Sequence, residues 1–161
     1  MASKPSLKKI KKMKNDIDLI KKFIKKNFED YLYEDSEDKK DAKKILKKLN
    51  VPEDHFFYYY YSTYDAGEIY VDERDDEKVF YEMLYIDNLQ EEREYLDKKF
   101  KLAPNFLPIT STEGDGCTLY NVNNRSVADV TFDQFTELEN GEFIPQWNSF
   151  EEFLIDFLNI K

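Results

Sequence analysis

The sequence predicts an α+β fold in which an antiparallel sheet of about four to six strands is flanked by helices and a closing C-terminal helix packs on the sheet. Apolar residues recur at three- and four-residue steps near both ends of the chain, as in amphipathic helices. Short β-rich segments separated by turn residues occupy the middle and second half. The 161 residues, 41% hydrophobic and 36% charged, fit one soluble globular domain.

The net charge of −10 is unevenly distributed along the chain. Residues 1–50 contain 16 lysines against 9 acidic residues, a net charge of +7. Residues 51–161 contain 8 lysines or arginines against 25 acidic residues, a net charge of −17. The negative field of this larger part disfavours nucleic acid as the main ligand and favours a cationic partner.

Three features predict a soluble protein of the reducing cytoplasm. The chain contains no run of 18 or more apolar residues. Its lysine-rich beginning leads into a charged helix and not into the apolar segment of a signal peptide. Cys117 is the only cysteine, so no intramolecular disulfide is possible.

Residues 1–38 are predicted to form a basic amphipathic helix followed by an acidic turn. The apolar stripe of this helix is Leu7, Ile10, Met13, Ile17, Ile20, Ile24 and Phe28. Two interpretations are open for the lysine-rich segment 8–26. The helix packs its apolar stripe on the rest of the protein, or it binds an anionic membrane or nucleic acid.

Residues 39–161 are predicted to form the α+β part of what is overall a single structural domain. A short helix over residues 42–49 ends near Asn50, and Val51-Pro52-Glu53-Asp54 is typical of a new helix start. The six aromatic residues at 56–61 have strand propensity but follow this helix signal. We predict a helix that closes at Gly67, because glycine adopts the left-handed conformation that ends many helices.

The remaining elements alternate between strands and helices. The predicted strands cover residues 68–71, 78–86, 106–109, 117–122 and 126–132. An acidic turn at 72–77 joins the first two strands, and Asn123-Asn124-Arg125 joins the last two, where asparagine suits a positive φ. A connecting helix is predicted over 90–100, and Pro108 places its strand at a sheet edge. Ser149-Phe150-Glu151-Glu152 is a capping box that starts the closing helix.

Candidate catalytic and ligand-binding residues are few. His55 is the only histidine, and it sits in the predicted aromatic helix, where a lone histidine is more often a structural or surface residue than a catalytic base. Cys117 begins a predicted strand, where a small core residue is expected. The loop Glu113-Gly114-Asp115-Gly116 offers carboxylates where a phosphate requires donors, and the acidic turn 72–77 lacks EF-hand spacing. We therefore expect no enzyme activity, metal or cofactor.

The order of several short motifs resembles the SUKH superfamily over about residues 40–160. In the first half these motifs are Val51-Pro52-Glu53-Asp54, Asp65-Ala66-Gly67 and Glu68-Ile69-Tyr70-Val71. In the second half they are Leu107-Pro108-Ile109-Thr110-Ser111, Gly114-Asp115-Gly116, Cys117-Thr118-Leu119-Tyr120 and Asn148-Ser149-Phe150-Glu151-Glu152-Phe153-Leu154. The second half is the stronger match.

This resemblance implies a helix-flanked antiparallel sheet that has no catalytic residues and binds another protein. Many SUKH members are bacterial immunity proteins that neutralise a toxin. We therefore expect an immunity protein whose acidic surface covers a basic toxin domain, for example a nuclease. Two alternatives remain open: a regulatory scaffold of the same fold, and a peripheral membrane or nucleic-acid adaptor that uses the N-terminal helix.

Six residues are predicted to contact the partner protein. Asp65, Glu68, Asp72 and Asp76 surround the first predicted hairpin, and Asp115 and Tyr120 belong to the second. Carboxylates complement a cationic partner, and tyrosine provides a large contact area at low entropy cost. The alternative interpretation is that these residues are solvated turn acids and one sheet tyrosine.

Overall fold

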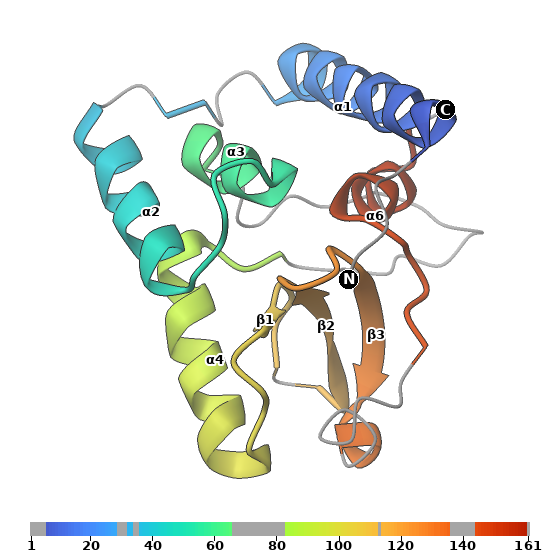
Figure 1. Cartoon of the computed structure of the whole chain (residues 1–161). Helices are drawn as coiled ribbons and strands as arrows, with labels where there is room; N and C mark the ends of the chain where they lie inside the picture. Colours follow the sequence, from blue (N-terminus) through green and yellow to red (C-terminus); the bar gives the residue numbers. More distant parts are fainter. Residues whose placement is uncertain are drawn as a thin grey trace.

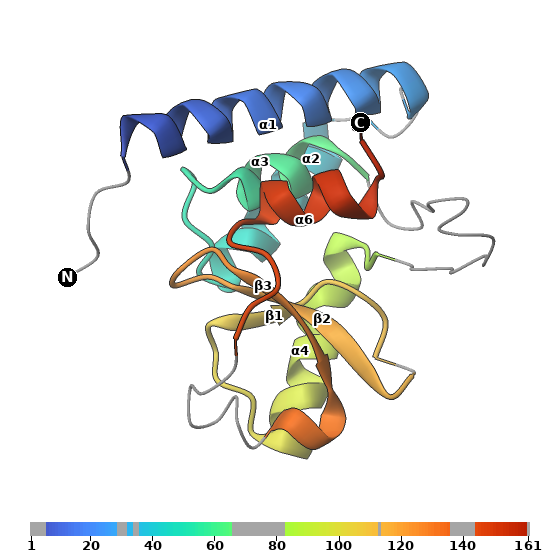
Figure 2. The same cartoon turned by 90° about the vertical axis from the view of Figure 1, so that its right-hand side faces the viewer.

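The computed structural model describes residues 6–28, 32–33, 36–65, 83–112, 114–135 and 144–160. These residues form an α+β fold. Its elements are α1 (Leu7–Asn27), α2 (Ser36–Lys48), α3 (Phe56–Thr63), α4 (Ile86–Phe100), β1 (Phe106–Pro108), β2 (Gly116–Asn121), β3 (Val127–Thr131), the 3-10 helix η2 (Phe132–Gln134) and α6 (Phe150–Phe157). Helix α1 forms an outer layer over α3 and α6, and the sheet lies beneath them with α4 beside it (Figures 1 and 2).

The predicted helices at both ends of the chain are confirmed. Ser6 is the N-cap of α1, and its side chain accepts a hydrogen bond from Lys9 N; the buried residues of the helix are Ile20 and Ile24. Helix α6 begins after Ser149, whose hydroxyl accepts from Glu152 N. The Glu152 carboxylate accepts from Asn148 N, one residue before the cap, so the reciprocal bond of the capping box is displaced by one residue.

The aromatic run forms helix α3, as predicted, but both of its ends differ from the prediction. The helix begins at Phe56 with His55 as its N-cap, because Pro52 O accepts from His55 N in a turn that precedes the helix. It ends at Tyr64 in an extended conformation, so no glycine closes it. Gly67 lies outside the described residues.

The sheet has the order β1-β2-β3 and is antiparallel throughout. The predicted strands at 106–109, 117–122 and 126–132 are confirmed within one or two residues, and Pro108 lies in an outer strand of these three. The hairpin turn takes its positive φ, 66°, at Arg125 and not at either asparagine. Asn124 instead uses its side-chain oxygen to accept from Ser126 N.

Most of the first predicted hairpin lies outside the described residues, including 68–71, the turn 72–77 and 78–82. After it, Met83 forms an isolated antiparallel bridge with Thr110. Ile86 begins α4, four residues before the predicted helix start, and does not end a strand. The described ranges therefore contain three strands, fewer than the four to six expected.

The two faces of the sheet contact different helices. One face packs its strand residues Leu119 and Val130 against Leu96 of α4. On the other face, the Tyr120 ring stacks on Phe57 of α3, with ring centroids 4.2 Å apart. Phe150 of α6 lies 4.9 Å from the Phe57 ring and 5.8 Å from the Tyr120 ring. The closing helix therefore approaches the sheet through one aromatic residue and packs against α1 and α3.

Helix α1 belongs to the main core, because Ile20 and Ile24 join the cluster that holds the α3 aromatics. With 21 residues it is the longest of the described helices. Its nine lysines prevent it from crossing a bilayer, and none of the other described helices is long and apolar enough to do so.

Candidate functional site

Three exposed carboxylates from separate elements lie around Tyr33. Asp38 belongs to the first turn of α2, Asp87 belongs to the first turn of α4, and Asp65 follows the end of α3. Tyr33 is held against α3, because its backbone N–H donates to Thr63 O at 3.1 Å. Helix N-termini favour acidic side chains through the helix dipole, which explains Asp38 and Asp87 locally. We call Asp38, Asp65 and Asp87 the acidic cluster.

Within the described part of the chain, the carboxylates of the acidic cluster repel one another and have no cationic partner in an ion pair. Partial burial raises the pKa of Asp65, and the neighbouring charges of Asp38 and Asp87 raise it further. Burial, followed by Asp65, Asp87 and Asp38, raises the pKa of Tyr33 to about 12. The ion pairs of the described residues, Lys12–Glu152 and Arg125–Asp54, do not involve the cluster. A cationic side chain placed there would therefore relieve the repulsion.

The structure places the predicted contact residues in different parts of the molecule. Asp65 is exposed within the acidic cluster, whereas Glu68, Asp72 and Asp76 lie outside the described residues. Asp115 is also exposed, but it lies at the start of β2, where its carbonyl accepts from Phe132 N at 2.9 Å. This end of the sheet is remote from α3 (Figure 1), so Asp115 does not extend the acidic cluster.

Tyr120 does not fit the interpretation as a contact residue. Its side chain is 1% exposed, between α3 and α6, and its hydroxyl shares a hydrogen bond of 2.8 Å with His55 Nδ1. Strand alternation puts Tyr120 on the face that these two helices cover. A partner protein therefore cannot reach it in this conformation.

Two members of the acidic cluster, Asp38 and Asp87, were missed by the sequence reasoning. Asp38 was treated only as part of an acidic turn, although it starts a helix. Asp87 was missed because residues 78–86 were predicted to form a strand and the helix to begin at residue 90, whereas α4 begins at Ile86. The signal that could have revealed them is an acidic residue in the first turn of a helix.

Three buried polar side chains, His55, Tyr120 and Glu151, lie at the beginnings of α3 and α6 and on β2. His55 and Glu151 are 6% and 5% exposed. Burial and then the positive charge of Arg125 lower the pKa of His55, which keeps the imidazole neutral near neutral pH. Burial raises the pKa of Glu151, opposed by its hydrogen bond with Ser149. Burial also raises the pKa of the Tyr120 hydroxyl, so the group contains no activated nucleophile.

Cys117 and the described acidic residues provide no other reactive centre. Burial, followed by the charges of Asp129 and Glu92, raises the pKa of the Cys117 thiol to about 12, so it remains protonated near neutral pH. Within the described ranges, no three His, Cys, Asp or Glu side chains are grouped to hold a metal ion.

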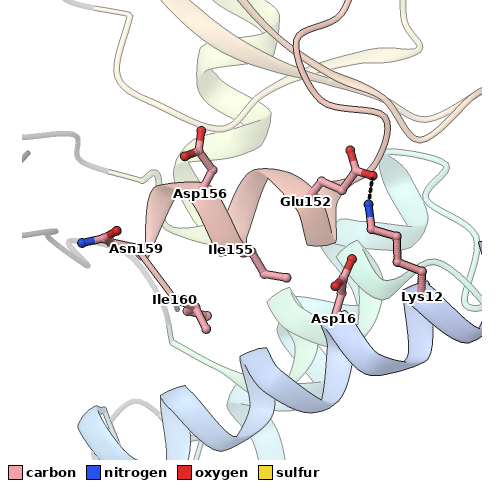
Figure 3. Close-up of a pocket in the computed structure, with 7 residues that line it drawn as sticks. All are labelled: Lys12, Asp16, Glu152, Ile155, Asp156, Asn159 and Ile160. Carbon is pink, nitrogen blue, oxygen red and sulfur yellow. Dashed lines mark hydrogen bonds and ion pairs between the residues drawn. The ribbon is translucent and has the colours of Figure 1, made fainter.

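A shallow groove of about 270 Å³ separates α1 from α6 (Figure 3). Its lining residues are Lys12, Asp16, Glu152, Ile155, Asp156, Asn159 and Ile160. Lys12 Nζ crosses one end and lies 3.0 Å from Glu152 Oε1. Asp156 accepts a hydrogen bond from Trp147 Nε1 at 3.1 Å. The Lys12–Glu152 pair joins α1 to α6, whereas the Trp147–Asp156 bond ties α6 to the segment that precedes it.

A second hollow, of about 480 Å³, lies between α4 and the segments that flank β2 and β3. Lys99 lines this hollow, and its ammonium group lies 5.5 Å from the centre of the Tyr95 ring and 5.9 Å from the centre of the Phe132 ring. Lys99 also donates to the Tyr95 hydroxyl at 3.1 Å. These aromatic rings therefore already have a cationic partner, the side chain of Lys99.

Neither a family model nor a curated protein sequence matches this chain. The functional argument therefore depends on the geometry described above. Among the described residues, the acidic cluster brings together exposed carboxylates from several elements that take part in neither the Lys12–Glu152 nor the Arg125–Asp54 ion pair.

Proposed function

We propose that the protein is a non-enzymatic binding module that neutralises a basic partner, such as a toxin domain, through a surface centred on the acidic cluster. The observation that carries the proposal is that exposed carboxylates from three separate elements, Asp38, Asp65 and Asp87, come together beside Tyr33. Partial burial and then the charges of Asp38 and Asp87 raise the pKa of Asp65, in keeping with this proximity. Carboxylates that repel one another are stabilised when a Lys or Arg side chain approaches. The −17 charge of residues 51–161 would also attract such a partner at long range.

The resemblance to the SUKH superfamily supports the same proposal. The described elements follow the order that the resemblance implies, from aromatic helix through antiparallel hairpin to closing helix. We further propose that the sheet extends beyond the three described strands, through pairing of residues 83–84 with 109–110. Its support is the bridge between Met83 and Thr110 and the hydrogen bond from Leu84 N to Ile109 O at 2.9 Å, which continue the pairing beyond β1.

The first experiment is a pull-down from the native cytoplasm with the tagged full-length chain, washed at low and then at high salt. Captured proteins are identified by mass spectrometry, expressed alone to test toxicity, and co-expressed with this chain to test rescue. We expect a basic, toxic protein that salt releases, because exposed charge pairs are screened by ions.

Two matched triple variants test the surface. The site variant is Asp38→Asn, Asp65→Asn and Asp87→Asn, and the control is Asp41→Asn, Glu94→Gln and Asp97→Asn. Both remove three negative charges from exposed positions. The site variant is expected to weaken partner binding by about tenfold or more, and the control by less than about twofold. Circular dichroism checks that both fold, since helix-start acids contribute about 0.3–1 kcal/mol.

Equal binding by the two variants would contradict the proposed surface. Capture of a non-toxic housekeeping protein through the acidic cluster would instead favour the regulatory scaffold. Binding that does not change with salt would contradict the electrostatic basis of the proposal, because surface charge pairs weaken as ionic strength rises.

A further inference from the structure

Helix α1 is the most basic of the described helices. The helix carries nine lysines against two aspartates, a net charge of +7, in a chain of net charge −10. One of these lysines, Lys12, pairs with Glu152, and Lys21 lies 4.4 Å from the centre of the Tyr59 ring. The others are exposed, and they include Lys8, Lys11 and Lys22.

The geometry of α1 makes this charge available to a flat surface. Its 21 residues span about 30 Å, and both views show it as an outer layer of the fold (Figures 1 and 2). Ile20 and Ile24 face the core, so the lysines on the opposite side point away from the protein. The later part of the apolar stripe, at Ile20 and Ile24, is thus buried in the fold, which leaves the lysine-rich face and the start of the stripe exposed.

The first turns of α1 add exposed apolar side chains to this charge. Leu7 is 86% exposed and Ile10 is 38% exposed, and their three-residue spacing puts them on the same side of the helix. Lys8 and Lys11 follow each of them directly in the sequence. Isolated exposed leucines are common, but a leucine and an isoleucine among lysines at one end of a basic helix suit the boundary between lipid headgroups and acyl chains.

We propose that the lysine-rich face of α1, with Leu7 and Ile10, docks the protein on an anionic phospholipid bilayer. Both lipid phosphates and nucleic-acid phosphates would attract the lysines. The apolar pair distinguishes them, because a bilayer gains from burying Leu7 whereas a phosphate backbone does not. This surface is separate from the acidic cluster and does not depend on the proposed partner.

The negative charge of the remaining chain does not prevent this docking. At physiological ionic strength, charges are screened over about 8 Å, so acidic side chains on the far side of the fold interact weakly with the bilayer. Each lysine near an anionic surface strengthens binding by about fivefold. Several lysines of α1 in contact with the bilayer multiply this increase in affinity, whereas the negative charge of Asp18 on the same helix reduces it.

Vesicle sedimentation with the full-length chain tests the proposal. The probes are phosphatidylcholine vesicles, alone or with about one third phosphatidylglycerol, at about 0.1 M salt. The wild-type chain is expected to bind the anionic vesicles at least about tenfold more tightly than the neutral ones. A duplex oligonucleotide serves as the competing polyanion.

Three variants locate the surface. Lys8→Gln, Lys11→Gln and Lys22→Gln together are expected to lower the partition coefficient by up to about 100-fold. The matched α2 variant, Lys40→Gln, Lys44→Gln and Lys47→Gln, removes the same charge from exposed positions and is expected to lower it by less than about threefold. Leu7→Ser is expected to lower it at least about fivefold, through lost apolar burial alone.

Several results would overturn the proposal. Equal binding to neutral and anionic vesicles, or equal losses in the α1 and α2 variants, would remove the basis for docking through α1. Unchanged binding of Leu7→Ser would show that no apolar side chain enters the bilayer. Tighter binding to the duplex than to anionic vesicles would assign the lysines to nucleic acid instead.

Discussion

The hydrogen bond between Tyr120 and His55 allows a direct test of how the sheet is joined to α3. The substitution Tyr120→Phe removes one oxygen atom and keeps the ring that stacks on Phe57 at 4.2 Å. His55 Nδ1, 2.8 Å from that oxygen, then loses its partner in a side chain that is 6% exposed. The packing is preserved, so the change isolates the hydrogen bond.

The expected cost of Tyr120→Phe is about 2 kcal/mol in the free energy of unfolding. A buried polar atom left without a partner costs about 1–3 kcal/mol, more than the net value of an exposed hydrogen bond. Tyr95→Phe is the matched control, because Tyr95 is 45% exposed and its hydroxyl accepts from Lys99 at 3.1 Å. We expect the control to cost less than about 0.5 kcal/mol.

Urea unfolding followed by far-ultraviolet circular dichroism measures both variants, with an unchanged m-value as the check that the folded state is intact. A double variant of Tyr120→Phe with His55→Ala should cost less than the sum of its parts, because both changes remove the same bond. The reasoning is refuted if Tyr120→Phe unfolds within about 0.5 kcal/mol of the wild type.

Two further predictions concern stability. A Cβ atom at Gly116 would lie 2.0 Å from Val130 O, so Gly116→Ala should lower the free energy of unfolding, measured by thermal unfolding, by about 2–4 kcal/mol. At Gly114 a Cβ atom would meet no atom within 4 Å, so the control Gly114→Ala should change the free energy of unfolding by less than about 0.5 kcal/mol. The folded-state pKa of His55 is below its ordinary value of 6.5, so its contribution to stability is present above pH 6.5 and is lost as pH falls toward the folded pKa. Unfolding at about pH 7.5 and 5.5 should show this decrease, and His55→Asn should reduce it; an unchanged pH dependence in His55→Asn would assign the decrease to other groups.

Local patterns predicted the helices well where a strong periodicity coincided with a capping residue. Helix α1, with its three- and four-residue apolar spacing, and α6, with Ser149, are examples. The aromatic helix α3 was also predicted correctly against its β propensity, from a helix-start signal at residues 51–54 that the structure shows to be a turn before the helix. Its exact ends were wrong, since Tyr64 pairs with Leu32 and leaves the helix there. That pairing involves a residue far away in the sequence.

The candidate surface was harder to predict than the elements. Asp65 was selected for its charge, and its electrostatic neighbours Asp38 and Asp87 come from distant helix starts. Tyr120 was selected as a surface aromatic and is a core residue. The sequence shows which residues are charged, but which carboxylates lie close together and which side chains are buried depend on how the helices and the sheet pack.

Local patterns and composition were enough to predict the α+β class, the end helices, the hairpin of β2 and β3, and the separation of a basic first 50 residues from an acidic remainder. These depend on short-range periodicity, turn residues and composition. Only the tertiary structure decided that Tyr120 is covered, that Asp38, Asp65 and Asp87 gather around Tyr33, and that α1 keeps a lysine face outside. The physical reason is that burial and electrostatic coupling arise between residues distant in the chain, where packing of whole elements selects which faces meet.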